Sequence, residues 1–179
     1  MDHDDPFEPL GVIPAGQETE AAASPGEPSA DSVPGEAATG FLRFTAGGLC
    51  FAVEIGRVKE ILGPRQVTPV PRTPHWIRGI ISHRGAIISL LDLCGRLGLD
   101  HRSAAGFGRI VVVRSGGGVA GLLVDGVRGV VSLLLSSIEP PGEGGGRDFV
   151  AGTTRQGGEE LLLLNLEKVL DLEWNSTAA

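Results

Sequence analysis

The residue types that most often carry catalysis or bind metals are few in this chain and lie far apart. The chain contains no phosphate-binding loop ending in Lys-Ser or Lys-Thr and no Gly-x-Ser-x-Gly nucleophile turn. No carboxylate pair is placed for acid–base work, and lysine occurs only at Lys59 and Lys168. The histidines have no cysteine or second histidine at metal-ligand spacing: His3, His75, His83 and His101. The sequence therefore predicts no catalytic residues, no metal site, no cofactor and no enzymatic activity.

Two glycine runs resemble phosphate-binding loops at first sight. These are Gly116–Gly118 and the segment GEGGGR at residues 142–147. The first run links one predicted strand to the next, and neither run leads into a helix whose N-terminus could bind phosphate. We interpret both as turn or loop glycines.

Two charged residues are better candidates for recognition. Glu60 lies in a predicted strand between the apolar residues Val58 and Ile61, and Arg84 lies in the turn SHRG just before Gly85. A turn position before glycine accepts any polar residue, so an ordinary solvated arginine is one interpretation. An exposed Glu60–Arg84 ion pair would add at most about 1 kcal/mol. Partner recognition is the better purpose, because a guanidinium offers planar, multi-donor hydrogen bonding at interfaces.

The elements that must position these residues are short strands. The chain holds 28 Gly and 12 Pro in 179 residues, and only 4% of its residues are aromatic although 41% are hydrophobic. Such a composition favours tight turns, short strands and an aliphatic core. Nine of the 22 acidic residues lie in residues 1–40, which contain no Lys or Arg. The rest is nearly neutral, with 13 acidic and 15 basic residues, so it has no electrostatic footprint for nucleic acid.

Residues 1–40 are rich in Pro, Glu, Ala, Gly and Ser, which predicts a disordered acidic tail. Within it, Phe7–Pro14 is an apolar island, either an incidental cluster or a short docking motif. The chain opens without a signal peptide and has no apolar run of about 18 residues, so we expect a cytoplasmic protein without membrane insertion. Cys50 and Cys94 are then expected to be free thiols.

The pattern of apolar residues predicts two similar units. Hairpins are expected at 41–54, turning at Gly47–Gly48, and at 79–93, turning at SHRG. The proline-rich residues 63–74 should form an extended connector. From Arg109 the pattern repeats at about seventy residues, ending in a hairpin that turns at Gly157–Gly158. Asp92 and Asn165 are the expected N-caps of two short helices.

This repeat predicts a mainly β fold of two small closed barrels with five strands each. The first barrel would span about 41–100 and the second about 108–173, and an exchange of strands between the two is left open. The hairpin of residues 73–93 would close the first barrel and display Arg84.

The chain resembles the CheW family of coupling proteins in bacterial chemosensory arrays. The resemblance covers nearly all of residues 41–172 and rests on FLRFTAGGLCFAVEIGRVKEIL, TPHWIRGIISHRGAIISLLDL, GLLVDGVRGVV and LLLLNLEKVL in family order. It implies two packed SH3-like five-stranded barrels and a non-enzymatic adaptor without cofactors. The implied partners are the cytoplasmic tip of chemoreceptors, the regulatory domain of the histidine kinase CheA and other CheW-like proteins in rings.

The resemblance also implies a receptor-facing groove between the barrels. The residues of this sequence at the matching positions are Val58, Glu60, Ile61, Gly79, Arg84 and Gly85. The sequence departs from the family where Ser82 and His83 precede Arg84, since the family usually has Asn at the position of Ser82. A CheW-like scaffold of a non-flagellar chemosensory pathway is therefore one alternative. A small nucleic-acid-binding barrel is another, although the near-neutral charge and few aromatic residues speak against it.

Overall fold

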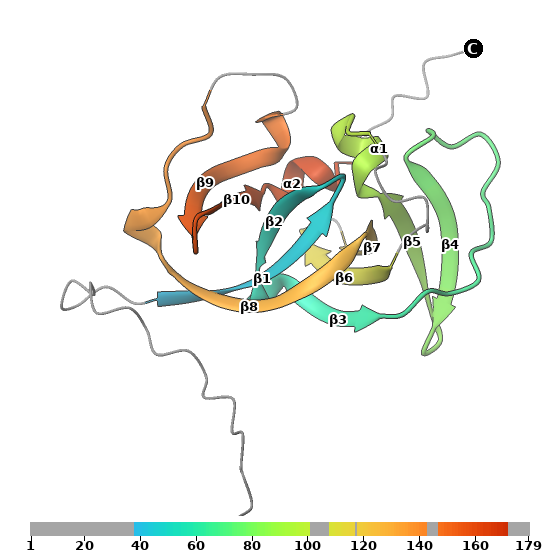
Figure 1. Ribbon diagram of the computed structural model, residues 1–179. Coiled ribbons are helices and arrows are strands. Elements are labelled where there is room, and N and C mark those ends of the chain that lie inside the picture. Colours follow the sequence, from blue (N-terminus) through green and yellow to red (C-terminus); the bar gives the residue numbers. More distant parts are fainter. Residues whose placement is uncertain (1–37, 101–107, 117, 143–146, 172–179) are drawn as a thin grey trace, which may run out of the picture. The chain divides into compact units, whose positions relative to one another are not determined.

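The computed structural model describes residues 38–100, 108–116, 118–142 and 147–171 (Figure 1). Over these residues the chain is mainly β. The strands are β1 (Ala38–Ala46), β2 (Leu49–Glu54), β3 (Val58–Leu62), β4 (Ile77–His83), β5 (Ala86–Asp92), β6 (Arg109–Ser115), β7 (Gly118–Val124), β8 (Gly126–Leu134), β9 (Val150–Gln156) and β10 (Glu159–Leu164). The α-helices are α1 (Leu93–Leu97) and α2 (Leu166–Val169), and the 3₁₀ helices are η1 (Ile55–Arg57), η2 (Leu135–Ser137) and η3 (Arg147–Phe149).

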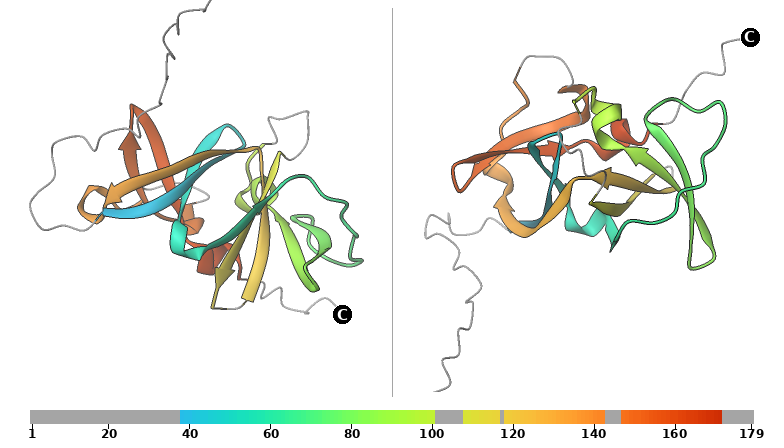
Figure 2. Two further views of the ribbon diagram at one scale, coloured as in Figure 1. Left: turned by 90° about the horizontal axis from the view of Figure 1, so that it is seen from below. Right: turned by 45° about the vertical axis from the view of Figure 1, so that its right-hand side comes forward.

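The strands form two five-stranded sheets, each built from both halves of the chain. The first sheet has the order β8-β1-β2-β10-β9, and the second has the order β3-β6-β7-β5-β4. The blue start and the red end of the chain accordingly lie together, while green and yellow strands make the other sheet (Figures 1 and 2). Adding five to each strand number of one order, and counting on from β10 to β1, reproduces the other order. The sequence repeat thus corresponds to a repeat in topology.

Two predicted boundaries need correction. The barrels are not the contiguous segments 41–100 and 108–173, because β3 to β5 pair with β6 and β7 while β8 to β10 pair with β1 and β2. Strand exchange, which the sequence left open, is what the pairing shows. The predicted tail of residues 1–40 also extends too far, since Ala38, Thr39 and Gly40 pair with β8 opposite Leu134, Leu133 and Ser132.

The barrels close through matching contacts. In the connector after β3, Thr68 exchanges two backbone hydrogen bonds of 2.9 Å with Ile80 of β4. In the connector after β8, Glu139 does the same with Thr153 of β9 at 2.8 Å. A glycine precedes the strand partner in both cases, and a side chain on Gly79 would collide with the Thr68 carbonyl oxygen at 2.2 Å.

Buried side chains fill the inside of each curved sheet, and the largest cluster lies between the two sheets. The largest cluster of buried side chains joins β1 and β2 to β5, β6 and β7 and includes Phe44, Phe51, Leu91 and Leu122. Both short helices cover it, through Leu93 of α1 and Val169 of α2 among others. Their predicted N-caps are confirmed, since Asp92 accepts a hydrogen bond from the Gly95 N–H and Asn165 from that of Lys168. No helix in the described part of the chain is long and apolar enough to cross a membrane.

Candidate functional site

The strongest candidate site lies where β3 approaches the tip of the β4–β5 hairpin. β3 and β4 are the outermost strands in the order of the second sheet. A contact between them therefore crosses the seam at which the barrel closes. β3 carries a register shift between Val58 and Glu60, an irregularity that changes the direction of side chains locally. The hairpin itself extends away from the neighbouring strands (Figure 2).

Glu60 is the centre of a three-residue cluster. Its Oε1 atom lies 3.2 Å from Nη2 of Arg84, and its Oε2 atom lies 2.8 Å from Nε2 of His83. Because an ionised carboxylate only accepts hydrogen bonds, Nε2 of His83 is the donor. The exposed fraction of the side chain is 76% for Arg84, 29% for Glu60 and 12% for His83. The arginine is therefore displayed to solvent, while the other two residues lie beneath it.

This cluster favours the charged form of Glu60. The hydrogen bond from His83 is the main reason that the pKa of Glu60 lies below its usual value. The charges of Arg84, His83 and Arg65 act in the same direction, against an opposing effect of burial. The site thus presents a fixed carboxylate and a guanidinium side by side. Such a pair can bind a polar partner group with either sign of charge.

The backbone at Arg84 is unusual for a residue with a side chain. Arg84 has φ 49° and Gly85 has φ 79°, as the tight turn between β4 and β5 requires. Two other tight hairpins turn at Gly47–Gly48 and Gly157–Gly158, with φ between 59° and 87°. Glycine adopts this conformation with little strain, whereas other residues pay about 1 kcal/mol or more. An arginine in the same place is a strained residue at an exposed tip, which points to a function for its side chain.

The structure separates the six residues expected from the sequence into two groups. Glu60, Arg84 and Gly85 come together at the hairpin tip, and Ile61 lies exposed next to Glu60 on β3. Val58 is half-buried and packs against the main core cluster. Gly79 is buried at the other end of β4, where it admits the Thr68 carbonyl group.

Two features, one at this site and one elsewhere on the surface, were missed from the sequence. His83 was noted only as a departure from the family pattern, although its place beside Arg84 at the end of a strand was a usable signal. The second is an apolar patch of Ile55 and Val130, whose side chains are 41% and 62% exposed. Both lie within 4 Å of where a Cβ on Gly40 would sit, so they flank one point of β1. This contact between distant segments leaves no local signal.

A second polar cluster ties together three separate elements. Glu167 of α2 accepts a hydrogen bond of 2.6 Å from Ser115 at the end of β6, and one of 3.1 Å from Arg57 of η1. Ser115 is the main cause that lowers the pKa of Glu167. Glu167 therefore joins α2 to β6 and η1. Among the described residues no group of three or more His, Cys, Asp or Glu side chains could hold a metal ion.

Comparison with known proteins places this scaffold in a family. The model of the CheW-like domain matches residues 40–173, and the chain belongs to this family. It is 33% identical over 136 residues to the chemotaxis protein CheW of Klebsiella aerogenes, covering 74% of this chain and 82% of that protein. It is 34% identical over 134 residues to the protein FrzA of Myxococcus xanthus, covering 73% and 84%.

A solved structure shows the same fold. The crystal structure of the scaffolding protein TtCheW from Thermoanaerobacter tengcongensis superimposes with a TM-score of 0.71 at 29% sequence identity. The superposition covers 76% of this chain and 90% of that one.

Proposed function

We propose that this protein is a non-enzymatic scaffold of a bacterial chemosensory pathway. In this role it couples the cytoplasmic tips of chemoreceptors to the regulatory domain of a CheA-type histidine kinase. Membership of the CheW-like family supports the proposal, as do relatives named chemotaxis protein CheW and scaffolding protein TtCheW. The protein would act in the cytoplasm, where the receptor tips lie. Other CheW-like proteins would be further partners in ring-shaped assemblies.

The strained backbone of Arg84 at the hairpin tip is the observation that supports a particular binding site. Three hairpins share one turn geometry, and two of them use glycine at the first turn position. Only the hairpin next to Glu60 has an arginine there, with its side chain displayed to solvent. Stability alone does not explain this choice, because an exposed ion pair contributes little.

We assign receptor binding to the surface around this tip. Glu60 and Arg84 would bind polar groups of a receptor helix, and the exposed Ile61 would contact its apolar side chains. Val58, Gly79 and Gly85 would support this surface, the first two from within the fold and the third by forming the turn.

Co-sedimentation with a receptor-tip fragment and a CheA regulatory domain tests the proposal. The full-length protein should sediment with each partner separately and should bridge the two when all three are mixed. Binding to neither partner would overturn the scaffold assignment. Binding to the kinase domain alone would leave a kinase-binding module and remove the coupling role.

The pathway is a separate question from the role. Identity to the chemotaxis protein CheW and to FrzA is nearly equal, at 33% and 34%. Ser82, at a position where the family usually has Asn, is one departure that keeps a non-flagellar chemosensory pathway as the alternative. Sedimentation with receptor tips from each type of pathway distinguishes the two, since the cognate tip should bind more tightly.

A further inference from the structure

The proposed function makes no use of a cavity beside the second barrel. It measures about 490 Å³ and opens into the second barrel. Its floor consists of Ile110 of β6 and Leu123 of β7, which are buried members of the cluster inside that barrel. Val67 of the connector and Ile77 of β4 form its walls. The volume falls within the range of natural ligand sites, which is about 300–1,000 Å³.

The cavity stays open because a connector, and not a full strand, closes the barrel there. β3 ends at Leu62, and the connector then pairs with β4 through the single bridge between Thr68 and Ile80. Pro64 and Pro69 lie on either side of this bridging segment and line the cavity. A proline has a restricted φ and no backbone N–H group to donate to a neighbouring strand. The segment therefore cannot form a full strand that would cover the opening. The opening is therefore built into the fold.

The charged side chains around this cavity are all basic within the described residues. Arg65, Arg78 and Arg109 line it together with His75, and no Asp or Glu does. Arg65 belongs to the connector, Arg78 to β4 and Arg109 to β6, so three separate elements bring their charges to one rim. A rim of this kind favours a ligand that carries negative charge.

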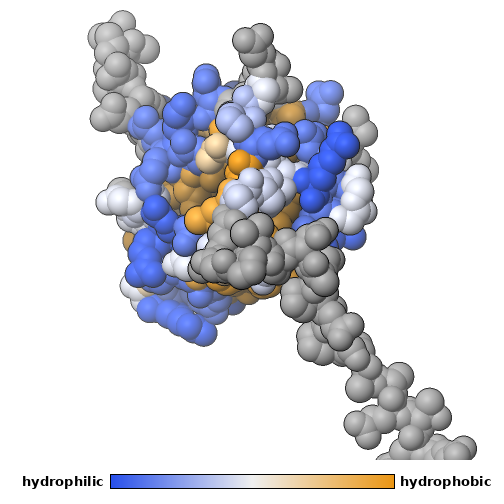
Figure 3. Space-filling view, turned by 90° about the vertical axis from the view of Figure 1, so that its left-hand side faces the viewer, coloured by the Kyte–Doolittle hydropathy of each residue, from blue (hydrophilic) through white to orange (hydrophobic). Residues whose placement is uncertain are grey.

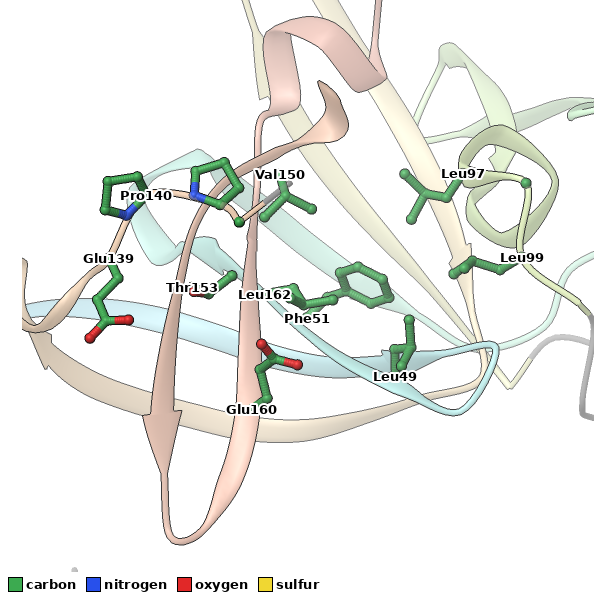
Figure 4. Close-up of a pocket in the computed structure, with 13 residues that line it drawn as sticks. Leu49, Phe51, Leu97, Leu99, Glu139, Pro140, Val150, Thr153, Glu160 and Leu162 are labelled. Atoms are coloured by element: carbon green, nitrogen blue, oxygen red, sulfur yellow. The ribbon is translucent and has the colours of Figure 1, made fainter. Parts of the chain in front are cut away.

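The corresponding connector of the first barrel provides an internal comparison. It lines a cavity of about 750 Å³ whose apolar lining includes Phe51 and Leu162. Its charged residues are Glu139 and Glu160, whose carboxylates lie at one side of the apolar group (Figure 4). A space-filling view from the side of β8 to β10 likewise shows apolar atoms recessed among hydrophilic ones (Figure 3). The cavity beside the first barrel's connector thus carries acidic and not basic charged side chains.

The ligand must satisfy both the apolar floor and the cationic rim. A free phosphate ion would leave the floor uncovered, and single-stranded nucleic acid would need aromatic stacking partners. The lining contains neither Phe nor Trp. A peptide that presents a large apolar side chain between carboxylates matches both parts, because arginine pairs well with carboxylates.

We propose that this cavity binds an acidic segment of a partner protein. One large apolar side chain of the segment enters and rests on Ile110 and Leu123. Its neighbouring carboxylates lie against Arg65 and Arg109. The buried apolar anchor supplies most of the affinity, while the exposed charges select the partner and speed its approach. Arg78 and the turn residue Arg84 are six residues apart along the hairpin, which is roughly 20 Å, so the cavity lies away from the hairpin tip. Arg65 is the rim residue whose charge also reaches Glu60 of the proposed receptor surface.

Binding of a synthetic peptide to the full-length protein tests this site. The probe is a labelled eight-residue peptide with Phe-Leu at its centre and two carboxylates on each side, measured by fluorescence anisotropy. The variant His75→Glu/Arg109→Glu cancels the net positive charge of the rim and spares Arg65, whose charge also reaches Glu60. We expect at least a tenfold loss of affinity in this variant. The control Arg155→Glu, at an exposed position of β9 in the first sheet, should bind as the wild type does.

Two altered probes separate the floor from the rim. Replacing Phe-Leu by Ser-Ser should abolish binding, and replacing the carboxylates by glutamine should weaken it at least tenfold and remove its salt dependence. Equal binding of the original Phe-Leu peptide to wild type and to the rim variant would overturn the proposal. So would an affinity that rises tenfold when the chain's own Phe7 and Leu10 are changed to alanine, because the occupant would then be the chain itself. Receptor-tip binding should be unaffected by the rim variant, so this test can fail while the scaffold assignment stands.

Discussion

Arg84 combines a strained backbone with a displayed side chain. The turn that it occupies prefers glycine, and the residue beneath it, Glu60, holds both Arg84 and His83. The same carboxylate also links the two outermost strands of the barrel. Side chains at this tip can therefore contribute to recognition and to closure of the seam, and substitutions have to separate the two contributions.

The substitution Arg84→Glu should weaken binding of a receptor-tip fragment by about tenfold or more. The melting temperature should stay near that of wild type, because exposed substitutions usually change stability by within about 0.5 kcal/mol. Isothermal titration calorimetry and thermal unfolding measure the two effects.

Arg84→Gly is the matched control, since it keeps the turn and removes only the side chain. It should lose receptor binding as well, with stability within about 1 kcal/mol of wild type. If either variant unfolds the domain, Arg84 is a structural residue and the assignment of the receptor surface is wrong.

Acid should weaken the protein through Glu60 and Glu167. Hydrogen bonds from His83 and Ser115 lower the pKa values of these carboxyl groups in the folded state, against a usual value of 4.5. A lowered folded-state pKa contributes stability that is present above the unfolded-state pKa and is lost as the pH falls through the folded-state pKa. The free energy of unfolding should thus decline as the pH drops below about 4.5.

Urea denaturation between pH 7 and pH 3 measures this decline. The variant Glu167→Gln should show a shallower decline than wild type, and Glu60→Gln/Glu167→Gln a shallower one still, since the two sites do not share partners. Parallel curves for wild type and the double variant would contradict this assignment.

At the scale of elements, matching glycines allow both barrels to close. Gly79 and Gly152 each face a backbone carbonyl of the connector that pairs with their strand. This role accounts for Gly79, which is buried in β4 against the carbonyl group of Thr68.

The substitution Gly79→Ala should destabilise the protein by about 3 kcal/mol or more. The added Cβ would lie 2.2 Å from the Thr68 carbonyl oxygen, at a φ of 139° that side chains rarely adopt. Gly85→Ala is the matched control, because its φ is also positive but nothing lies within 4 Å of the new Cβ. It should cost only about 1 kcal/mol. Equal losses in chemical denaturation would show that the contact with Thr68 does not matter.

A single arginine joins the two helices of the repeat. Arg96 of α1 donates hydrogen bonds to the carbonyl groups of Lys168, Val169 and Asp171 at the end of α2. Its guanidinium also lies over the rings of Trp76 and Phe149, at 4.2 and 4.9 Å from their centroids. Cations are favourable at helix C-termini, and cation–π contacts add to this effect.

Arg96→Met should therefore lower the free energy of unfolding by about 2 kcal/mol, through lost hydrogen bonds and cation–π contacts. Arg96→Lys should recover little of this loss, because an ammonium cannot reach three carbonyl groups in a fork. Arg114→Met, at an exposed position of β6, is the control and should stay near wild type. A full recovery by lysine would show that charge alone, and not the fork geometry, stabilises this junction.

At the scale of the whole molecule, the exchange of strands makes the two halves interdependent. Residues 38–100 contribute two strands to the first sheet and three to the second, and residues 108–171 do the reverse. The main core cluster also takes buried side chains from both halves.

Neither half should fold when it is produced alone, because each would leave two incomplete sheets with exposed apolar faces. Mixing the two should restore the fold in a one-to-one complex. Circular dichroism and the dispersion of amide proton shifts measure both states. A folded 38–100 fragment would show that this half can complete its own sheet, contrary to the pairing in the full chain.

The sequence determined the features that depend on neighbouring residues. The hairpin turns at Gly47–Gly48, Arg84–Gly85 and Gly157–Gly158, the caps Asp92 and Asn165 and the family motif could all be predicted, because turns and caps are local in origin. Their repetition in order also predicted two similar units. Glu60 and Arg84 were recognisable as charged residues among apolar ones, and the structure brings them into contact.

Only the tertiary structure decided which unit each strand completes. Pairing of β3 with β6 and of β8 with β1 joins segments far apart in the chain, and the apolar pattern of a strand is compatible with either sheet. The same long-range contacts place His83 on Glu60 and bring three arginines to one cavity. Arg84 itself was visible in the sequence as a polar residue before glycine. Its contact with Glu60 came only from the tertiary structure, since that contact depends on how the distant strand β3 meets the turn.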